Sequence, residues 1–135
     1  MGTNLKAPLF LSQAAAATLQ KNHGVIINLT DVHGIRPLSE FSVYCAAKAG
    51  LIMLTQVLAR ELGPAIRVNG IAPGAILWPE QPMAEEKRAE LLAKTALDRM
   101  GSPKDIAQTV LFLVSNAPYI TGQVIAVDGG RLLNH

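Results

Sequence analysis

Apolar and polar positions along this chain follow two patterns: long stretches that mix both kinds of residue, and short runs that are almost entirely apolar. The long stretches favour amphipathic helices, and the short β-branched runs favour buried strands of a parallel sheet. Helices are predicted over residues 5–21, 43–62, 83–98 and 103–115. Strands are predicted over residues 25–29 (VIINL), 66–72 (IRVNGIA) and 123–127 (QVIAV).

The order of these elements predicts an α/β fold with a parallel sheet. Three apolar parallel strands need cover on both faces and further strands beside them. The chain also opens on a helix that no strand precedes. We therefore expect residues 1–135 to form a single partial domain of a larger protein.

Composition narrows the class of protein. The chain has 135 residues, half of them apolar, with 16% charged residues and a net charge of +2. No basic run interleaved with aromatic residues is present, so we expect no nucleic-acid partner. No apolar run approaches the roughly 18 residues that cross a membrane, so we expect no membrane association. The single cysteine fits a reducing compartment and predicts a cytoplasmic protein without an internal disulfide. We also expect no metal site.

Candidate chemistry centres on Tyr44 and Lys48, which lie one helical turn apart and so project from the same face. An ammonium group near the phenol favours the phenolate, so Lys48 is expected to lower the pKa of Tyr44 and make it a proton donor. Asp31 ends the preceding apolar run and is expected to face the same space. Two plainer interpretations stay open: the pair is an ordinary surface pair, and Asp31 only caps a turn.

Several segments together carry a resemblance to a known family. They are TNLKAPLFLSQ around Asn4, the strand IINL, Tyr44-x-x-x-Lys48, RVNGIAPG at 67–74, RMGSP with Asp-Ile-Ala at 99–107, and ITGQVIAVDGG at 120–130. In this order they resemble the C-terminal half of the short-chain dehydrogenase/reductase family. The resemblance implies the C-terminal half of a Rossmann-type doubly wound parallel sheet. The glycine-rich phosphate loop of the fold is absent from this chain.

The resemblance also implies a catalytic set, which consists of Asn4, Asp31, Tyr44 and Lys48. Tyr44 would donate a proton while a nicotinamide supplies hydride. Lys48 would also bond the nicotinamide ribose, and Asn4 would hold a water in a relay behind it. In this family the position of Asp31 usually holds a serine.

The segment after the second strand is implied to meet the cofactor, which we expect to be NADPH. Pro73, Gly74 and Ile76 would contact its nicotinamide end, together with Tyr44 and Lys48. Trp78 stands where the family commonly has a threonine, and we expect it to line the substrate pocket. Because the phosphate loop is missing, residues 1–135 alone are expected to be inactive and to bind NADPH poorly.

Asp31 directs the expected substrate. An aspartate here is similar to the pteridine reductases, and a carboxylate can stabilise a protonated ring nitrogen, so Asp31, Tyr44 and Trp78 are expected to bind a pterin or dihydropterin. One alternative is a carbonyl or 3-oxoacyl-type reductase. A second is an inactive fragment that acts as an assembly module. The resemblance further implies a homotetramer assembled through the helices near 5–21 and 43–62.

Overall fold

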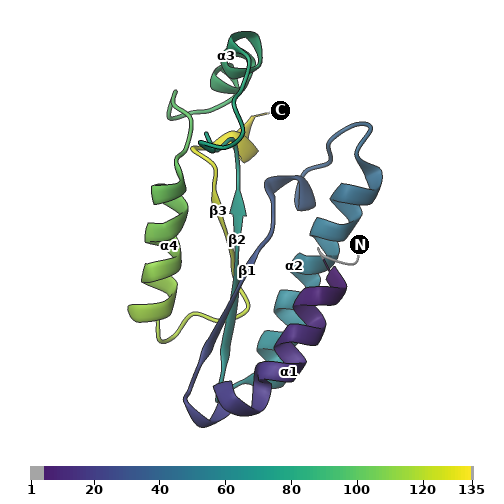
Figure 1. Cartoon of the computed structure of the whole chain (residues 1–135), viewed down its shortest axis with the longest axis vertical. Helices are drawn as coiled ribbons and strands as arrows, with labels where there is room; N and C mark the ends of the chain where they lie inside the picture. The colour runs from purple at the N-terminus through teal and green to yellow at the C-terminus, as the bar shows by residue number, and fades with distance from the viewer. Residues whose placement is uncertain (1–4, 135) are drawn as a thin grey trace.

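The computed structural model describes residues 5–134 as an α/β unit (Figure 1). Its elements are α1 (Ala7–Lys21), β1 (Val25–Leu29), α2 (Ser42–Leu62), β2 (Arg67–Pro73), α3 (Glu85–Ala93), α4 (Pro103–Ser115) and β3 (Val124–Val127), with single 3-10 turns at Val32–Gly34 and Arg131–Leu133. All the predicted helices and strands are present, and most boundaries agree within two residues. The predicted α/β fold with a partial Rossmann-type sheet is confirmed.

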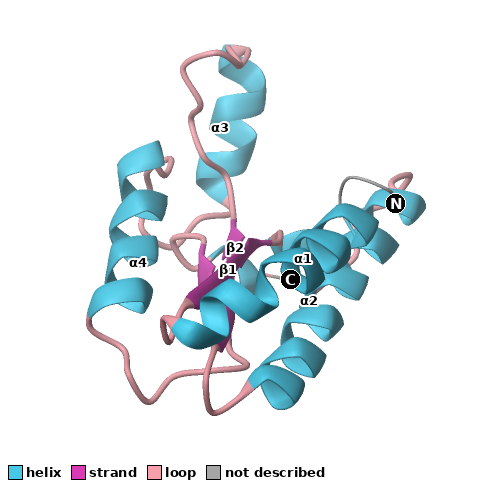
Figure 2. Ribbon diagram, turned by 60° about the horizontal axis from the view of Figure 1, so that its bottom comes forward, coloured by secondary structure: helices cyan, strands magenta, loops and turns pink. Residues whose placement is uncertain are grey.

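The three strands form one parallel sheet in the order β1-β2-β3. β2 is the central strand, and it pairs through Ile26 with Val68 on one side and through Ile71 with Ile125 on the other. α1 and α2 lie on one side of the sheet, and α4 lies on the opposite side (Figures 1 and 2). The sheet is therefore a layer between helices, as the apolar strands require.

Each face of β2 has its own core. Toward α2, Leu58 and Val68 are buried in one cluster, and Ile26 of β1 packs against it. Toward α4, Ile71 and Leu113 are fully buried in a second cluster. Alternate side chains of β2 thus enter opposite cores, which holds the strand between both helix layers.

The helix predicted over 83–98 is shorter than expected, because α3 ends at Ala93. Beyond it, the Thr95 hydroxyl donates back to the Leu91 carbonyl, and the Leu97 amide donates to the carbonyl of Gly129. Asp98 then takes a left-handed conformation with φ of 54°. The bond from Leu97 to the distant Gly129 holds the chain in a non-helical course after α3, although the local sequence would allow the helix to continue.

α2 corrects one expectation about apolar runs. It is 21 residues long, and its most apolar 18-residue window has a mean hydropathy of 1.4, so by length and composition it could cross a membrane. It is the one such helix among residues 5–134. One of its faces is buried against the sheet and carries Ala47, Leu51, Thr55 and Leu58. The same composition therefore serves here for packing on β2.

Candidate active site

Three of the four candidate catalytic residues, Asp31, Tyr44 and Lys48, lie together beyond the end of β1. Thr30 follows β1 directly, and both its amide and its hydroxyl donate to the carbonyl of Ile71, at 2.7 and 3.0 Å. Asp31 comes next, and Tyr44 and Lys48 occupy the first turns of α2. The buried Thr30 ties the start of the loop to the central strand, which fixes the backbone that carries Asp31.

Asp31 is bonded to Tyr44, as the sequence predicted for residues that share one space. The Tyr44 hydroxyl donates to Oδ2 of Asp31 at 2.8 Å. The other carboxylate oxygen, Oδ1, accepts the backbone amide of His33 at 2.8 Å. The plainer interpretation, in which Asp31 caps a turn, is therefore correct as well, and the cap is what aims Oδ2 at the phenol.

The pKa of Tyr44 lies above its ordinary value, so the expectation that the neighbouring Lys48 brings it down toward neutral pH is wrong. Burial of the phenol, the hydrogen bond to Asp31 and the negative charge of Asp31 raise the pKa of Tyr44 to about 12. The Lys48 ammonium lies 5.7 Å from the centroid of the Tyr44 ring, whereas the Asp31 oxygen is only 2.8 Å from the hydroxyl. Burial is the largest cause of the raised pKa, and the hydrogen bond and charge of the nearby Asp31 act in the same direction.

Lys48 lies over the Tyr44 ring because the two residues are one turn apart on α2, and the preceding loop packs against the backbone of this turn. A Cβ atom on Gly34 would lie 2.8 Å from the backbone carbon of Lys48, so the loop turn sits directly on α2 at this point. Only glycine permits so close an approach. Within residues 5–134, no ion pair includes Lys48, which leaves its ammonium available to a ligand.

The end of β2 is pressed against the end of β3. The Gly74 amide donates to the carbonyl of Val127, and a Cβ atom on Gly74 would lie 2.6 Å from that of Asp128. Pro73 is the last residue of β2. The backbone of this segment therefore closes one side of the carboxyl edge, and its predicted contact with a nicotinamide stays a prediction.

Two other predicted site residues, Ile76 and Trp78, are not joined to Asp31 by any contact within residues 5–134. The Ile76 side chain is buried in the core beneath α4, so a cofactor contact there falls to its backbone. Trp78 is half-buried and packs against the same core, and its expected role in lining the substrate pocket stays a prediction. Asn4 lies outside the described residues.

Sequence reasoning missed two groups near the site. The hydroxyl of Thr30 anchors the loop through a bond to β2, 41 residues away, which no local pattern signals. His33 has a buried Nδ1 atom without a hydrogen-bond partner within the described chain. The backbone amide of His33 orients Asp31, and the identity of the His33 side chain gives no signal of that role.

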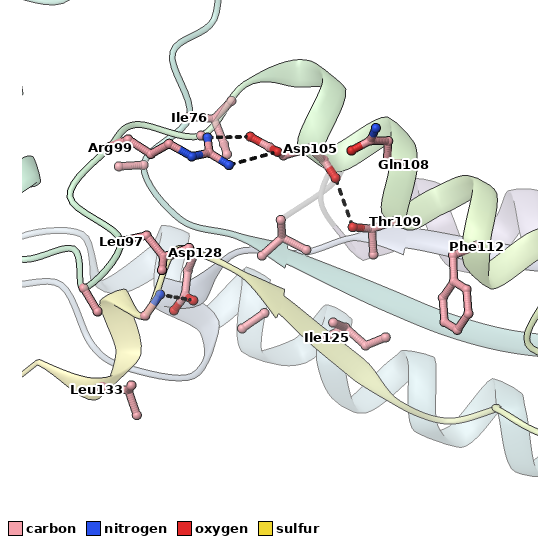
Figure 3. Close-up of a pocket in the computed structure, with 17 residues that line it drawn as sticks. Ile76, Leu97, Arg99, Asp105, Gln108, Thr109, Phe112, Ile125, Asp128 and Leu133 are labelled. Carbon is pink, nitrogen blue, oxygen red and sulfur yellow. Dashed lines mark hydrogen bonds and ion pairs between the residues drawn. The ribbon is translucent and has the colours of Figure 1, made fainter.

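A cavity of about 790 Å³, separate from Tyr44 and Asp31, lies on the α4 side of the sheet (Figure 3). Most of the polar groups that line it are already engaged in hydrogen bonds or ion pairs within the chain. Arg99 pairs with Asp105 at 3.0 Å, the Thr109 hydroxyl donates to the Asp105 carbonyl, and Asp128 accepts two backbone amides. Arg99 and Ser102 hold the pKa of Asp105 at about 2, so it stays ionised. The cavity therefore presents a mostly apolar wall, without an acid or base directed at a ligand.

The described residues include no cluster of side chains suited to bind a metal ion. Across residues 5–134 there is no group of three or more histidine, cysteine, aspartate or glutamate side chains close enough to share an ion. The chemistry at the edge of the sheet consequently rests on one phenol, one carboxylate and one ammonium.

Known proteins that contain similar sequences identify the family of this chain. A family model described as enoyl-(acyl carrier protein) reductase matches residues 1–131. The chain belongs to the short-chain dehydrogenase/reductase family. It is 38% identical to a 3-oxoacyl-[acyl-carrier-protein] reductase of Thermotoga maritima and 39% identical to a 7alpha-hydroxysteroid dehydrogenase of Bacteroides fragilis. Both alignments include 98% of this chain, with 56% and 53% of the respective relatives.

Solved structures of the family show the same unit inside longer chains. A 7α-hydroxysteroid dehydrogenase in complex with NADH and 7-oxo glycochenodeoxycholic acid superposes with a TM-score of 0.88 at 37% identity. The superposition covers 94% of this chain and 52% of that one. A short-chain dehydrogenase/reductase of Mycobacterium ulcerans gives a TM-score of 0.92 at 30% identity and is half covered. The chain thus spans about half the length of the relatives it matches.

Proposed function

We propose that this chain is the proton-donating half of a nicotinamide-dependent reductase that acts on a carbonyl group of a small molecule, of the 3-oxoacyl or oxosteroid kind. The observation that carries the proposal is the Tyr44 hydroxyl, bonded to Asp31 at 2.8 Å and overlaid by the Lys48 ammonium. The names of the Thermotoga maritima and Bacteroides fragilis relatives support a carbonyl or hydroxyl substrate better than a pterin.

The protonation state of Tyr44 favours the reducing direction. With a pKa of about 12, the phenol keeps its proton at neutral pH. A neutral phenol can give a proton to the strongly basic oxygen that forms when a carbonyl carbon accepts hydride. It cannot accept a proton from an alcohol in the reverse direction until it is first deprotonated. The Lys48 ammonium, close to the ring, stabilises the phenolate that remains after the transfer.

The residues present fit the nicotinamide end of a cofactor. Bound there, the cofactor would supply the hydride. The Lys48 ammonium, which forms no ion pair within the part of the chain that the structure describes, can donate to its ribose hydroxyls. The backbone of Pro73, Gly74 and Ile76 offers polar groups at the same edge. We propose NADPH as the partner. Because the related 7α-hydroxysteroid dehydrogenase was solved with NADH, both cofactors belong in the assay.

A second candidate is reduction of a C=N bond in a pterin or dihydropterin. Asp31 favours it, since ionised carboxylate oxygens only accept hydrogen bonds and one of them faces the phenol. A serine at this position would donate to a carbonyl oxygen, whereas a carboxylate repels the negative charge that develops there. The same oxygens would stabilise a ring nitrogen that gains a proton during reduction.

The deciding experiment uses a fusion in which the part of the Thermotoga maritima relative preceding the matched region is joined before Met1. The kcat/KM values for a 3-oxoacyl thioester, a 7-oxo steroid and a dihydropterin are compared, with NADPH and with NADH. Preference for the oxo compounds supports the carbonyl reductase, and preference for the dihydropterin supports the second candidate. Absence of turnover with every substrate, in a folded fusion that binds cofactor, contradicts both candidates. It would support the inactive assembly module instead.

Asp31→Ser sharpens the choice between the two candidates. It should lower the ratio of dihydropterin to oxo-compound kcat/KM by roughly ten- to a hundredfold if the carboxylate selects a protonated nitrogen, because charge pairs of this kind contribute about 1–3 kcal/mol. An unchanged ratio would show that Asp31 does not select the substrate.

We also propose a cytoplasmic homotetramer. α1 and α2 leave large apolar side chains exposed, among them Phe10, Met53 and Val57. Exposed apolar groups along two neighbouring helices suit an interface between copies. Native mass spectrometry of the fusion should show four copies, and Met53→Lys should reduce that number. Free Cys45 fits a reducing compartment.

A further inference from the structure

His33 carries the one buried side-chain nitrogen or oxygen atom among residues 5–134 that has no hydrogen-bond partner. The atom is Nδ1 of its imidazole ring. Folded proteins pair nearly all such atoms, and an exception calls for a physical cause, of which a role in binding or catalysis is one. The proposed reaction uses only the backbone amide of His33, so the ring has no function in it so far.

A single 3-10 turn holds this ring beside the candidate active site. Asp31, two positions before His33, accepts the Tyr44 hydroxyl with one carboxylate oxygen. The other oxygen of the same carboxylate accepts the His33 amide. Gly34, the next residue, lies against the backbone of Lys48. His33 is therefore fixed between the contacts to Tyr44 and to Lys48, within reach of a molecule bonded to the phenol.

The buried nitrogen decides which ring atom carries the proton. A neutral imidazole has one N–H donor and one acceptor nitrogen. A proton on Nδ1 would be a buried donor without an acceptor, and orphaned buried N–H groups are the rarer and more costly kind. The proton therefore belongs on Nε2. His33 is only half-buried, and no described residue bonds to Nε2, so this N–H is available to a ligand.

The candidate active site needs such a donor. The Tyr44 hydroxyl has a single proton, which the proposed reaction gives to the oxygen of the carbonyl that is reduced. An ionised Asp31 only accepts hydrogen bonds, and the Lys48 ammonium is the group proposed to bond the cofactor ribose. An Nε2–H group on His33 supplies a further donor, and it suits an acceptor oxygen of the substrate close to the reacting carbonyl.

We propose that His33 is a specificity-determining residue, whose Nε2–H donates to the second carbonyl oxygen of a 1,3-dicarbonyl substrate while Tyr44 protonates the first. A 3-oxoacyl thioester carries both oxygens, with one methylene between the two carbonyl carbons. A 7-oxo steroid has hydrocarbon on either side of its carbonyl and would leave the donor without a partner, which a site built for a hydrogen bond rejects. The inference rests on the proposed carbonyl reductase and selects the 3-oxoacyl kind of substrate within it.

The kinetic test uses the fusion with the Thermotoga maritima segment and two thioesters that have the same groups at different spacing. These are the 3-oxobutanoyl and 5-oxohexanoyl thioesters of N-acetylcysteamine. His33→Phe keeps a ring and the backbone amide that anchors Asp31, and it removes the donor. It should lower the ratio of kcat/KM for the 3-oxo over the 5-oxo compound at least about tenfold, mainly through KM, because the contact is made to a carbonyl that does not react.

Two further variants test which ring atom donates. Glutamine places an amide N–H near the position of Nε2, whereas the shorter asparagine places it near Nδ1. His33→Gln should therefore restore most of the substrate ratio, and His33→Asn should not. His23→Phe is the matched control, because His23 is an exposed histidine just beyond the end of α1, and its ratio should equal that of the wild type.

Two other measurements need no turnover. In the chain with His23→Gln and His135→Gln, His33 is the sole histidine, and its nitrogen-15 chemical shifts should show the proton of the neutral ring on Nε2. The 3-hydroxybutanoyl thioester keeps the second carbonyl but cannot accept hydride. In calorimetry with reduced cofactor present, it should bind the fusion at least about tenfold more tightly than it binds the His33→Phe fusion.

Four results would overturn the proposal. They are an unchanged substrate ratio in His33→Phe, rescue by asparagine instead of glutamine, a neutral ring protonated on Nδ1, and equal binding of the hydroxy thioester to both fusions. Reduction of oxo compounds with a ratio that ignores His33 contradicts this inference alone. A fusion that binds cofactor and reduces no oxo compound contradicts the proposed function, and binding of the hydroxy thioester then still decides the role of His33.

Discussion

The two flanks of the central strand differ in how their polar groups are satisfied. On the β3 and α4 side, side chains close the backbone of their own unit: Arg67 donates to the carbonyls of Leu113 and Ala117, and Asn69 bonds the backbone at both Ile120 and Gln123. On the β1 side the strand edge is open and Tyr44 is 37% exposed. The β3 and α4 side is the scaffold flank, because its side chains satisfy the backbone groups of its own unit. The β1 side is the reactive flank, because it carries Tyr44 and Asp31 at an accessible surface.

The largest effect is expected at the reactive flank. Tyr44→Phe in the fusion should reduce kcat by roughly 10²–10⁴-fold, the usual contribution of a general acid. Stability should change little, because the ring remains. Tyr119→Phe is the control, since the Tyr119 side chain is fully exposed and, within the described residues, forms no hydrogen bond with Asp31. Turnover of Tyr44→Phe within a few-fold of the wild type would exclude this phenol as the proton donor.

The scaffold flank should be most sensitive at Arg67. Its guanidinium donates to the carbonyls of Leu113 and Ala117 at 2.9 and 2.7 Å, at the end of α4. Arg67→Met should lower the free energy of unfolding by about 2–4 kcal/mol, because bonds from a charged donor are lost and part-buried carbonyls are left without partners.

Urea unfolding of the chain measures this loss, and Arg88→Met on exposed α3 provides the control. Equal urea midpoints for the two variants would show that the hydrogen bonds of Arg67 to the end of α4 do not stabilise the chain. The proposed difference between the two flanks, in which only the scaffold flank is stabilised by bonds between its own side chains and backbone, would then lose its main support.

A smaller effect is expected at the start of α4. Ser102 caps this helix in a capping box: its hydroxyl accepts the Asp105 amide, and the Asp105 carboxylate accepts the Ser102 amide at 2.8 Å. Ser102→Ala should cost about 1 kcal/mol of unfolding free energy, the usual value for a lost cap. Ser115→Ala, at the other end of the same helix, should be close to neutral. Thermal unfolding of both variants checks the difference.

The smallest effect is a shift in a titration. In a Tyr119→Phe background Tyr44 is the sole tyrosine, so phenolate absorbance reports its ionisation alone. The wild-type pKa should be about 12, and Asp31→Asn should lower it, because the carboxylate that stabilises the neutral phenol is removed. The shift should be partial, since burial is the larger cause. An unchanged or higher value would show that Asp31 does not hold the proton on Tyr44.

Sequence reasoning succeeded where local pattern decides the structure. The run VIINL becomes β1 with the predicted ends, and α4 begins at Pro103 as predicted. It failed where distant segments meet. α3 ends early where Leu97 bonds Gly129. The pKa of Tyr44 rises because the phenol is partly buried and is hydrogen-bonded to Asp31. Those distances depend on tertiary packing, which spacing along the chain does not contain.

Arg67 also bears on the order in which this chain can fold. Its partners at the end of α4 are 46 and 50 positions further along the chain. A bond of that span forms only after a long loop has closed, which is an entropically slow event. The capped start of α4 can form locally, whereas its last turn must wait until β2 is in place. We expect an isolated peptide of residues 99–120 to be helical at its beginning and frayed at its end.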